Sequence, residues 1–293
     1  MHGFSAIVCL QIKTCCYIPE KRNMLISCMR KRENMKKSII PDRMLYFLWG
    51  LVALTVLFSG LILFIPLLTL KDYHFISNLF EVIITLVCMI SSLYVYKFWS
   101  ERVLLLLAAF AFGGYALSNT FWFLYTEAFP NEGTLFNVSE LGFLGVMLFF
   151  IVGFRIEFPK KPCPASWRIA SGGLLFFILA LTTLGRTGIN KNPVLSLAWL
   201  LIIALFIDTA LNHGVYRHPL LWEGVCLWSF TSILYELWYN VVSGIVDTSV
   251  SVFFAPSPLP LGSFFDIIIG PLSFLSLLLL QLGIFEYLNS PED

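Results

Sequence analysis

The sequence contains little charge. Its 293 residues include 13% charged and 58% hydrophobic residues, and phenylalanine alone occurs 28 times. A soluble domain has about 25% charged residues, so this chain carries roughly half the usual amount. It cannot cover its apolar surface with polar side chains, which excludes an ordinary soluble domain and makes a lipid bilayer the expected partner.

The common catalytic and metal-binding motifs are also missing. The sequence has no HExxH, GxSxG or P-loop motif, no CxxC pair and no Cys–His spacing that suits zinc. His213 and His218 are five residues apart beside a predicted loop, where we expect a solvated pair. We therefore predict no metal, no cofactor and no nucleic-acid partner, and the sequence gives no basis for predicting an enzyme.

Long apolar runs are what the chain has instead. A spanning helix needs about 20 residues, and no interval shows the two-residue period of a strand. We predict an all-α polytopic membrane protein, with a transmembrane domain over residues 44–287 and a short tail at 288–293. Its eight transmembrane helices are expected at 45–70, 75–97, 103–126, 135–155, 167–185, 193–212, 219–244 and 260–285.

The basic residues predict the orientation. All 19 Lys and Arg lie at or outside the ends of the runs. If the N-terminus is cytoplasmic, all but Lys71, Arg186 and Lys191 are on the inner side, so the positive-inside rule places both termini in the cytoplasm of a cell-membrane protein. Residues 1–43 form a basic segment that we expect to be disordered, or an over-extended start, since Met35 followed by two lysines resembles a natural one.

The eight runs are consistent with two copies of a four-helix unit, residues 44–157 and 166–287. Aligning YALSNTFWFL with SILYELWYNV places Asn119 on Glu236, and each helix is followed by a loop and by a helix that opens with an acid, Glu140 or Asp266. Because each unit has an even number of spans, the copies would have the same orientation, unlike the inverted repeats of many transporters.

Several ionisable residues lie inside the predicted spans. Each costs about 2.5–3.5 kcal/mol on insertion scales and usually faces the protein interior. On the predicted topology, one layer in the outer half of the membrane is a candidate ligand or cation site: Glu81, Asn119, Glu140, Glu236 and Asp266. Asp208 and the nearby Asn212 lie toward the cytoplasmic side.

Glu236 has a polar face of its own. Ser232, Tyr239 and Asn240 lie on the same face of the predicted helix, because residues three and four apart are neighbours on a helix. We expect this stripe to point into the bundle and to meet Asp266 or a polar group of the first unit. Two carboxylates so close would share a proton.

Three interpretations of the acidic layer stay open. In the first, each acid fixes helix packing through a hydrogen bond. In the second, the acids belong to a pocket for a cation or amine that is lined by Trp122, Trp238, Tyr235 and Tyr239. The third interpretation is a proton relay in a transporter.

The segments SELGFLG and GSFFDIIIGPL, with the number of spans, resemble the multi-pass N-terminal membrane sensor regions of bacterial diguanylate cyclases and histidine kinases. The resemblance implies a sensory or regulatory membrane module. Because no output domain follows, it would signal through a separate cytoplasmic protein. The alternative is a small-solute or cation- or proton-coupled transporter, which needs a polar path to the cytoplasm that Asp208 and Asn212 could supply. A lipid-modifying enzyme would need a paired acid or His-rich site on the cytoplasmic side, which the sequence does not show.

Overall fold

The computed structural model describes residues 40–64, 70–128, 138–161, 163–184, 193–237, 249–250 and 259–289. The chain divides into two units, Met1–Met44 and Leu45–Asp293. All the packing reported below lies within the larger unit. The predicted N-terminal segment 1–43 falls outside the described residues except for its last four.

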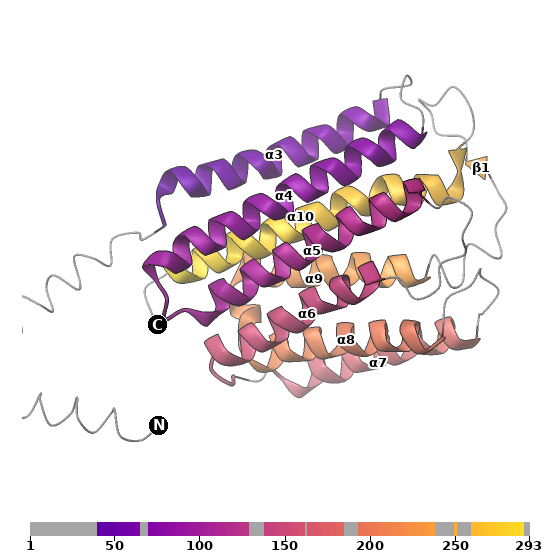
Figure 1. The fold of residues 1–293 in the computed structure, drawn as a ribbon. Helices are drawn as coiled ribbons and strands as arrows, with labels where there is room; N and C mark the ends of the chain where they lie inside the picture. Colours follow the sequence, from indigo (N-terminus) through magenta and orange to yellow (C-terminus); the bar gives the residue numbers. More distant parts are fainter. Residues whose placement is uncertain are drawn as a thin grey trace, which may run out of the picture. The chain divides into compact units, whose positions relative to one another are not determined.

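Eight α-helices make up almost all of the described chain (Figure 1). Each coincides with one of the predicted apolar runs, so the all-α expectation is confirmed there. The helices are α3 (Asp42–Phe64), α4 (Leu70–Phe98), α5 (Val103–Ala128), α6 (Val138–Glu157), α7 (Ala165–Leu184), α8 (Pro193–Asn212), α9 (Pro219–Leu237) and α10 (Leu261–Asn289).

Two short elements interrupt this pattern. A 3₁₀ turn, η1 (Val215–Arg217), follows Gly214, whose φ of 74° is left-handed and favours glycine. Strands β1 (Ser249–Val250) and β2 (Leu259–Pro260) pair antiparallel in the connection between α9 and α10. The sequence showed no two-residue period there, because two residues are too few to produce one.

Three described segments are long and apolar enough to cross a membrane. They are Ile76–Phe98 of α4, Val103–Leu124 of α5 and Ile269–Asn289 of α10, and Leu197–Asn212 of α8 is a shorter apolar helix. The chain is therefore a helical protein with membrane-spanning potential in both of its halves.

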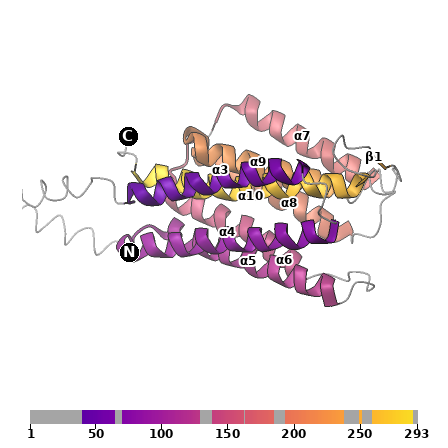
Figure 2. The same cartoon turned by 90° about the horizontal axis from the view of Figure 1, so that it is seen from above.

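The interior of the bundle is built on a group of three helices and a close pair. Helix α5 packs between α4 and α6, and α9 packs against α10. A contact between α4 and α10 joins the two groups, and α8 contacts both α6 and α9. In the turned view, α4, α5 and α6 lie on one side of the bundle and α7 on the opposite side (Figure 2).

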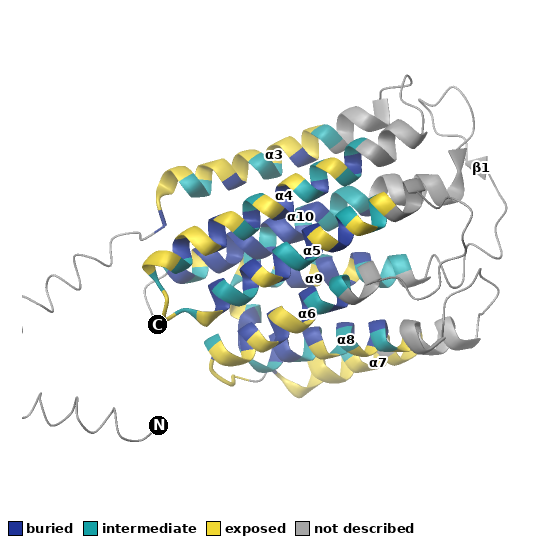
Figure 3. Cartoon of the chain, in the orientation of Figure 1, coloured by how far each residue is buried: buried dark blue, intermediate teal, exposed yellow. Residues whose placement is uncertain are grey.

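Buried residues gather on α5, α9 and α10, whereas α3 and α7 are largely exposed (Figure 3). Many exposed side chains of α7 are nevertheless large and apolar: Trp167, Ile169 and Phe176 are 64%, 74% and 73% exposed. Contiguous apolar surface of this kind is unusual for a protein in water. It is the surface that a bilayer would cover.

Candidate functional site

A buried carboxylate lies between α4 and α5. Glu81 on α4 is 8% exposed, and both of its oxygens accept hydrogen bonds from α5. The Tyr115 hydroxyl donates to Oε1, and the Asn119 amide donates to Oε2 at 2.7 Å. Tyr115 and Asn119 are four residues apart and therefore share one face of α5. Two of the predicted site residues, Glu81 and Asn119, are thus brought together.

Aromatic rings of α6 and α9 pack against Tyr115 at this site. The Tyr115 ring lies 4.9 Å from Phe143 of α6 and 5.4 Å from Trp228 of α9, measured between ring centroids. Trp228 is buried, and its indole Nε1 has no hydrogen-bond partner among the described residues. The polar group of the site is therefore set in an apolar shell to which three helices contribute.

The electrostatics of Glu81 are unbalanced. Its two donors are neutral, and neither of the ion pairs in the described part of the chain involves it. A buried carboxylate without a positive partner is costly because the surroundings cannot replace the water it has lost. The geometry therefore favours the uptake of one positive charge, either a proton or a cation.

The buried face of α4 is polar along much of its length. The residues of this stripe recur every three or four positions and are Ser77, Glu81, Thr85, Cys88, Ser91 and Ser92. The Thr85 hydroxyl donates to the Glu81 carbonyl, and Ser91 donates to the Cys88 carbonyl. From Ser77 to Ser92 the stripe is ~22 Å long, at 1.5 Å per residue.

The stripe ends in a joint between α4 and α10. Ser92 Oγ donates to Gln281 Oε1 at 2.9 Å, and Gln281 Nε2 donates to Ser91 Oγ at 3.2 Å. All three side chains are buried. A carboxamide in an apolar interior is favourable only with such partners, so Gln281 fixes how the last helix sits on α4.

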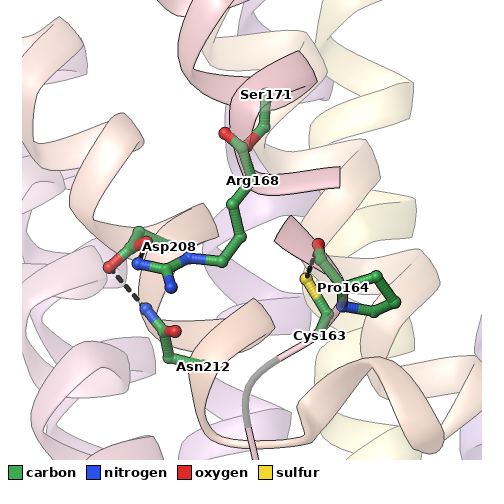
Figure 4. Close-up of polar contacts among 6 residues, drawn as sticks. All are labelled: Cys163, Pro164, Arg168, Ser171, Asp208 and Asn212. Atoms are coloured by element: carbon green, nitrogen blue, oxygen red, sulfur yellow. Dashed lines mark hydrogen bonds and ion pairs between the residues drawn. The ribbon is translucent and has the colours of Figure 1, made fainter. Parts of the chain in front are cut away.

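Asp208 and Asn212 form a separate group at the end of α8 (Figure 4). Asn212 Nδ2 donates to Asp208 Oδ2 at 2.8 Å, and Arg168 of α7 lies 3.7 Å from Asp208 Oδ1. The side chains of Arg168 and Asp208 are 46% and 49% exposed. Among the described residues, these side chains contact one another and not Glu81.

Three aromatic side chains meet at the same end of the bundle. Phe158, which follows α6, lies 5.4 Å from the His218 ring and 4.4 Å from the Tyr287 ring of α10. His218 and Tyr287 are 4.9 Å apart. We call these three residues the ring cluster. It holds the ends of α6 and α10 against the start of α9.

The histidines are more enclosed than a solvated pair. His218 is half-buried in the ring cluster, and His213 Nδ1 lies 3.0 Å from the Phe158 carbonyl oxygen. Burial lowers the pKa of His218 below its usual value of 6.5, and the positive charges of Arg217 and Lys161 lower it further. This partial enclosure arises because the turn after α8 folds back onto Phe158.

A salt bridge ties the neighbouring helix ends together. Arg102, just before α5, lies 2.5 Å from Glu157 at the end of α6. Tyr287 of the ring cluster also donates to Glu157, at 3.5 Å. The basic residues in this region thus have partners on the adjacent helices in addition to their place at the span ends.

The remaining predicted site residues cannot be placed in the same way. Glu140, Glu236 and Asp266 lie in α6, α9 and α10, but their side chains are outside the described residues, and so are Tyr239 and Asn240 entirely. The Glu236 stripe and its meeting with Asp266 therefore stay a prediction.

Sequence reasoning missed Tyr115 and Gln281. The signal for Tyr115 was its position four residues before Asn119 on a helix that already carried a candidate residue. Gln281 is not ionisable and so was not among the predicted site residues, although an amide in the middle of a predicted span also needs a partner.

Comparison with known proteins gives no assignment. No protein-family model matches the sequence, and no curated protein or solved structure is significantly similar to it.

Proposed function

We propose that this chain is an integral membrane protein of eight spans that acts as a sensory or regulatory module, taking up a proton or a small cation at Glu81. The observation that carries this proposal is a buried carboxylate with two neutral donors and no ion-pair partner among the described residues. The site lies in the outer half of the membrane if both termini are cytoplasmic. Binding there would be reported through the helices to a separate cytoplasmic protein.

The packing beyond the Ser92 end of the α4 stripe favours a sensor over a transporter. One turn beyond the Ser92–Gln281 joint, α4 presents buried Val95, and α10 presents buried Ile284 and Phe285. These side chains form an apolar layer between the stripe and the helix ends. A module that only binds and reports needs no polar path through that layer.

Proton- or cation-coupled transport is the second candidate. It is favoured by the length of the stripe, which runs from Ser77 through Glu81 to the Gln281 joint. In a transporter, the apolar layer at Val95 would be the closed side of an alternating-access cycle.

The packing is consistent with two parallel four-helix repeats, α3–α6 and α7–α10. Exchanging the halves turns the α4–α10 contact into the α8–α6 contact, and both are present. The same exchange reverses the order in which the helices are drawn from top to bottom in Figure 1: α3, α4, α10, α5, α9, α6, α8, α7. A pseudo-twofold axis along the membrane normal would produce this reversal, which the turned view does not repeat for α3 and α7 (Figure 2).

Glycines at the close helix pairs support the same relation. Gly153 of α6 faces Leu104 near the start of α5, and Gly283 of α10 faces Leu221 near the start of α9. Leu221 follows Leu104 by the same number of residues as Glu236 follows Asn119. In the proposed repeat, Glu236 would therefore occupy in α9 the position that Asn119 occupies in α5.

The binding proposal is tested by linkage. A ligand that binds the folded protein stabilises it by mass action, so the unfolding midpoint of purified protein in detergent is measured against pH and against NaCl, KCl and choline chloride. We expect a stabilisation by protons or by one cation that is absent from Glu81→Gln, which keeps only the pH dependence of other groups such as His218. Glu223→Gln, which changes an exposed carboxylate at the start of α9, is the matched control. If Glu81→Gln keeps the wild-type dependence, Glu81 is a structural residue.

The two candidates are separated in sealed proteoliposomes. A pH-sensitive dye inside the vesicles reports proton flux, and isotope uptake reports flux of the cation that stabilises the protein. The sensor proposal expects no flux above that of empty vesicles. Flux that the wild type supports and Glu81→Gln lacks would favour the transporter.

A further inference from the structure

We infer that the positive charge taken up by Glu81 is a proton, and that Asn119 is the side chain that lets the site exist both with and without it. This inference rests on the proposed function, because it names the ligand of the same site. It follows from the direction of the hydrogen bonds, the packing around Tyr115 and the chemistry of a carboxamide.

The hydrogen bonds disfavour a metal ion. Asn119 Nδ2 points its hydrogen at Oε2 and Tyr115 points its hydroxyl hydrogen at Oε1, so positive ends of dipoles already occupy the approach to both oxygens. Ca²⁺ and Mg²⁺ need about six or more oxygen ligands. Across the described residues, no group of three or more His, Cys, Asp or Glu side chains could hold a metal.

The packing disfavours an organic ammonium ion. Such a ligand is held over the exposed faces of aromatic rings. Here the Tyr115 ring is packed against Phe143 at 4.9 Å and Trp228 at 5.4 Å, and Tyr115 itself is buried. Those rings contact each other instead of enclosing a guest. A proton needs no such space.

The donors suit both protonation states. When Glu81 is ionised, Asn119 donates through Nδ2 and Tyr115 donates through its hydroxyl, as observed. When a hydronium ion transfers its proton to Oε2 and leaves as water, Glu81 becomes a neutral acid with one O–H donor. A half-turn of the Asn119 carboxamide then presents Oδ1 as the acceptor of that donor, while Tyr115 continues to donate to Oε1.

Few other titratable groups face this carboxyl. Tyr115 is the one that α5 presents to it, and Cys88 lies two turns away on α4 itself. Phe80, next to Glu81 on α4, has ring contacts with Phe58 of α3 and Phe274 of α10, neither of which is titratable. Asp266 lies in α10 with its side chain outside the described residues.

Infrared difference spectroscopy of the protein in lipid tests the inference. A protonated carboxylic acid has a C=O stretching band that a carboxylate lacks, so the band is followed against pH at constant ionic strength in NaCl, KCl and choline chloride. We expect a titrating band that is lost in Glu81→Gln and kept in Glu223→Gln, with the same midpoint in all three salts. Asn119→Leu, which cannot exchange donor for acceptor, should displace that midpoint, whereas Asn78→Leu, which keeps the backbone carbonyl near Asn119, should not.

The other outcomes are distinguishable. A midpoint that moves down by up to about one pH unit per tenfold rise in Na⁺ or K⁺ would show competition by that cation; it would overturn the proton inference and leave the cation-binding proposal intact. A spectrum without any Glu81-dependent titration would overturn both.

Discussion

At the scale of single residues, the Tyr115 hydroxyl is the contact that can be removed most cleanly. Tyr115→Phe keeps the ring against Phe143 and Trp228 but leaves Glu81 Oε1 without its donor. An unsatisfied buried acceptor costs about 1–3 kcal/mol, more if it is charged, so we expect the free energy of unfolding in mixed detergent to fall by at least that amount.

Tyr94→Phe is the control for this change, because Tyr94 is also on a span but is exposed. Its unfolding free energy should match that of the wild type. Equal losses in the two variants would mean that the Tyr115 hydroxyl does not stabilise the carboxylate.

The ring cluster predicts an acid-sensitive stability. Because the pKa of His218 is lower in the folded protein than its usual 6.5, the unfolded chain binds more protons over that interval, and the free energy of unfolding falls as the pH drops through and below 6.5. His218→Phe preserves ring packing on Phe158 and Tyr287 without a titratable group. We expect it to flatten the pH dependence between about pH 8 and about pH 5.

This measurement is made in the Glu81→Gln background, which removes the titration of the buried carboxyl. An unchanged acid-side slope in His218→Phe would show that the ring cluster does not respond to protonation.

These residues show how much of the site could be predicted from the sequence. Depth along a span and the cost of burying an acid were enough to place Glu81 and Asn119 in one layer. They could not show that the two touch, because the register between α4 and α5 depends on the packing of whole helix faces. Tyr115 and Gln281 needed the same information.

At the scale of helices, glycine permits the closest approach. A Cβ at Gly283 would collide with the backbone of Leu221, and one at Gly224 would lie 2.7 Å from the Leu280 amide nitrogen. Backbone cannot move aside as a flexible side chain can, so Gly283→Ala should separate α9 from α10 and cost about 1–3 kcal/mol or more. The unfolding free energy in detergent measures this loss.

Gly172→Ala is the matched control on α7, where a Cβ would meet nothing within 4 Å. We expect little change, or a slight gain from the higher helix propensity of alanine. A loss as large as that of Gly283→Ala would show that the close contact of α9 and α10 is not the cause.

The helices themselves were largely predictable. A run of about 20 apolar residues without the period of a strand has few alternatives in a chain with so little charge. The described part of α9 stops at Leu237, whereas the predicted helix continues to residue 244. Residues 238–248 are outside the described part of the chain. The β1–β2 pair was not foreseen because its partners are brought together by a loop and not by any local pattern.

For the whole molecule, the proposed eight-span topology makes a direct prediction. Reporter fusions after Glu132 and after Val252 should behave as extracytoplasmic, and fusions after Lys161 and at the C-terminus should behave as cytoplasmic, because basic loops stay inside. Alkaline phosphatase and green fluorescent protein give opposite readouts for each site. A cytoplasmic signal from the loop at 245–260 would exclude this topology.

The α4–α10 joint has a consequence for biogenesis. Helix α10 leaves the ribosome after the other seven described helices, yet it supplies Gln281 to Ser91 and Ser92 of α4, which is made much earlier. Until then the serines of α4 have no partner from α10, and the first half of the bundle lacks one wall. Nascent chains that have not yet released α10 therefore expose hydrophilic groups to lipid, which is the kind of surface that membrane chaperones and quality-control proteases recognise. Assembly of the described bundle should therefore await the docking of α10, and should not proceed step by step as each hairpin inserts.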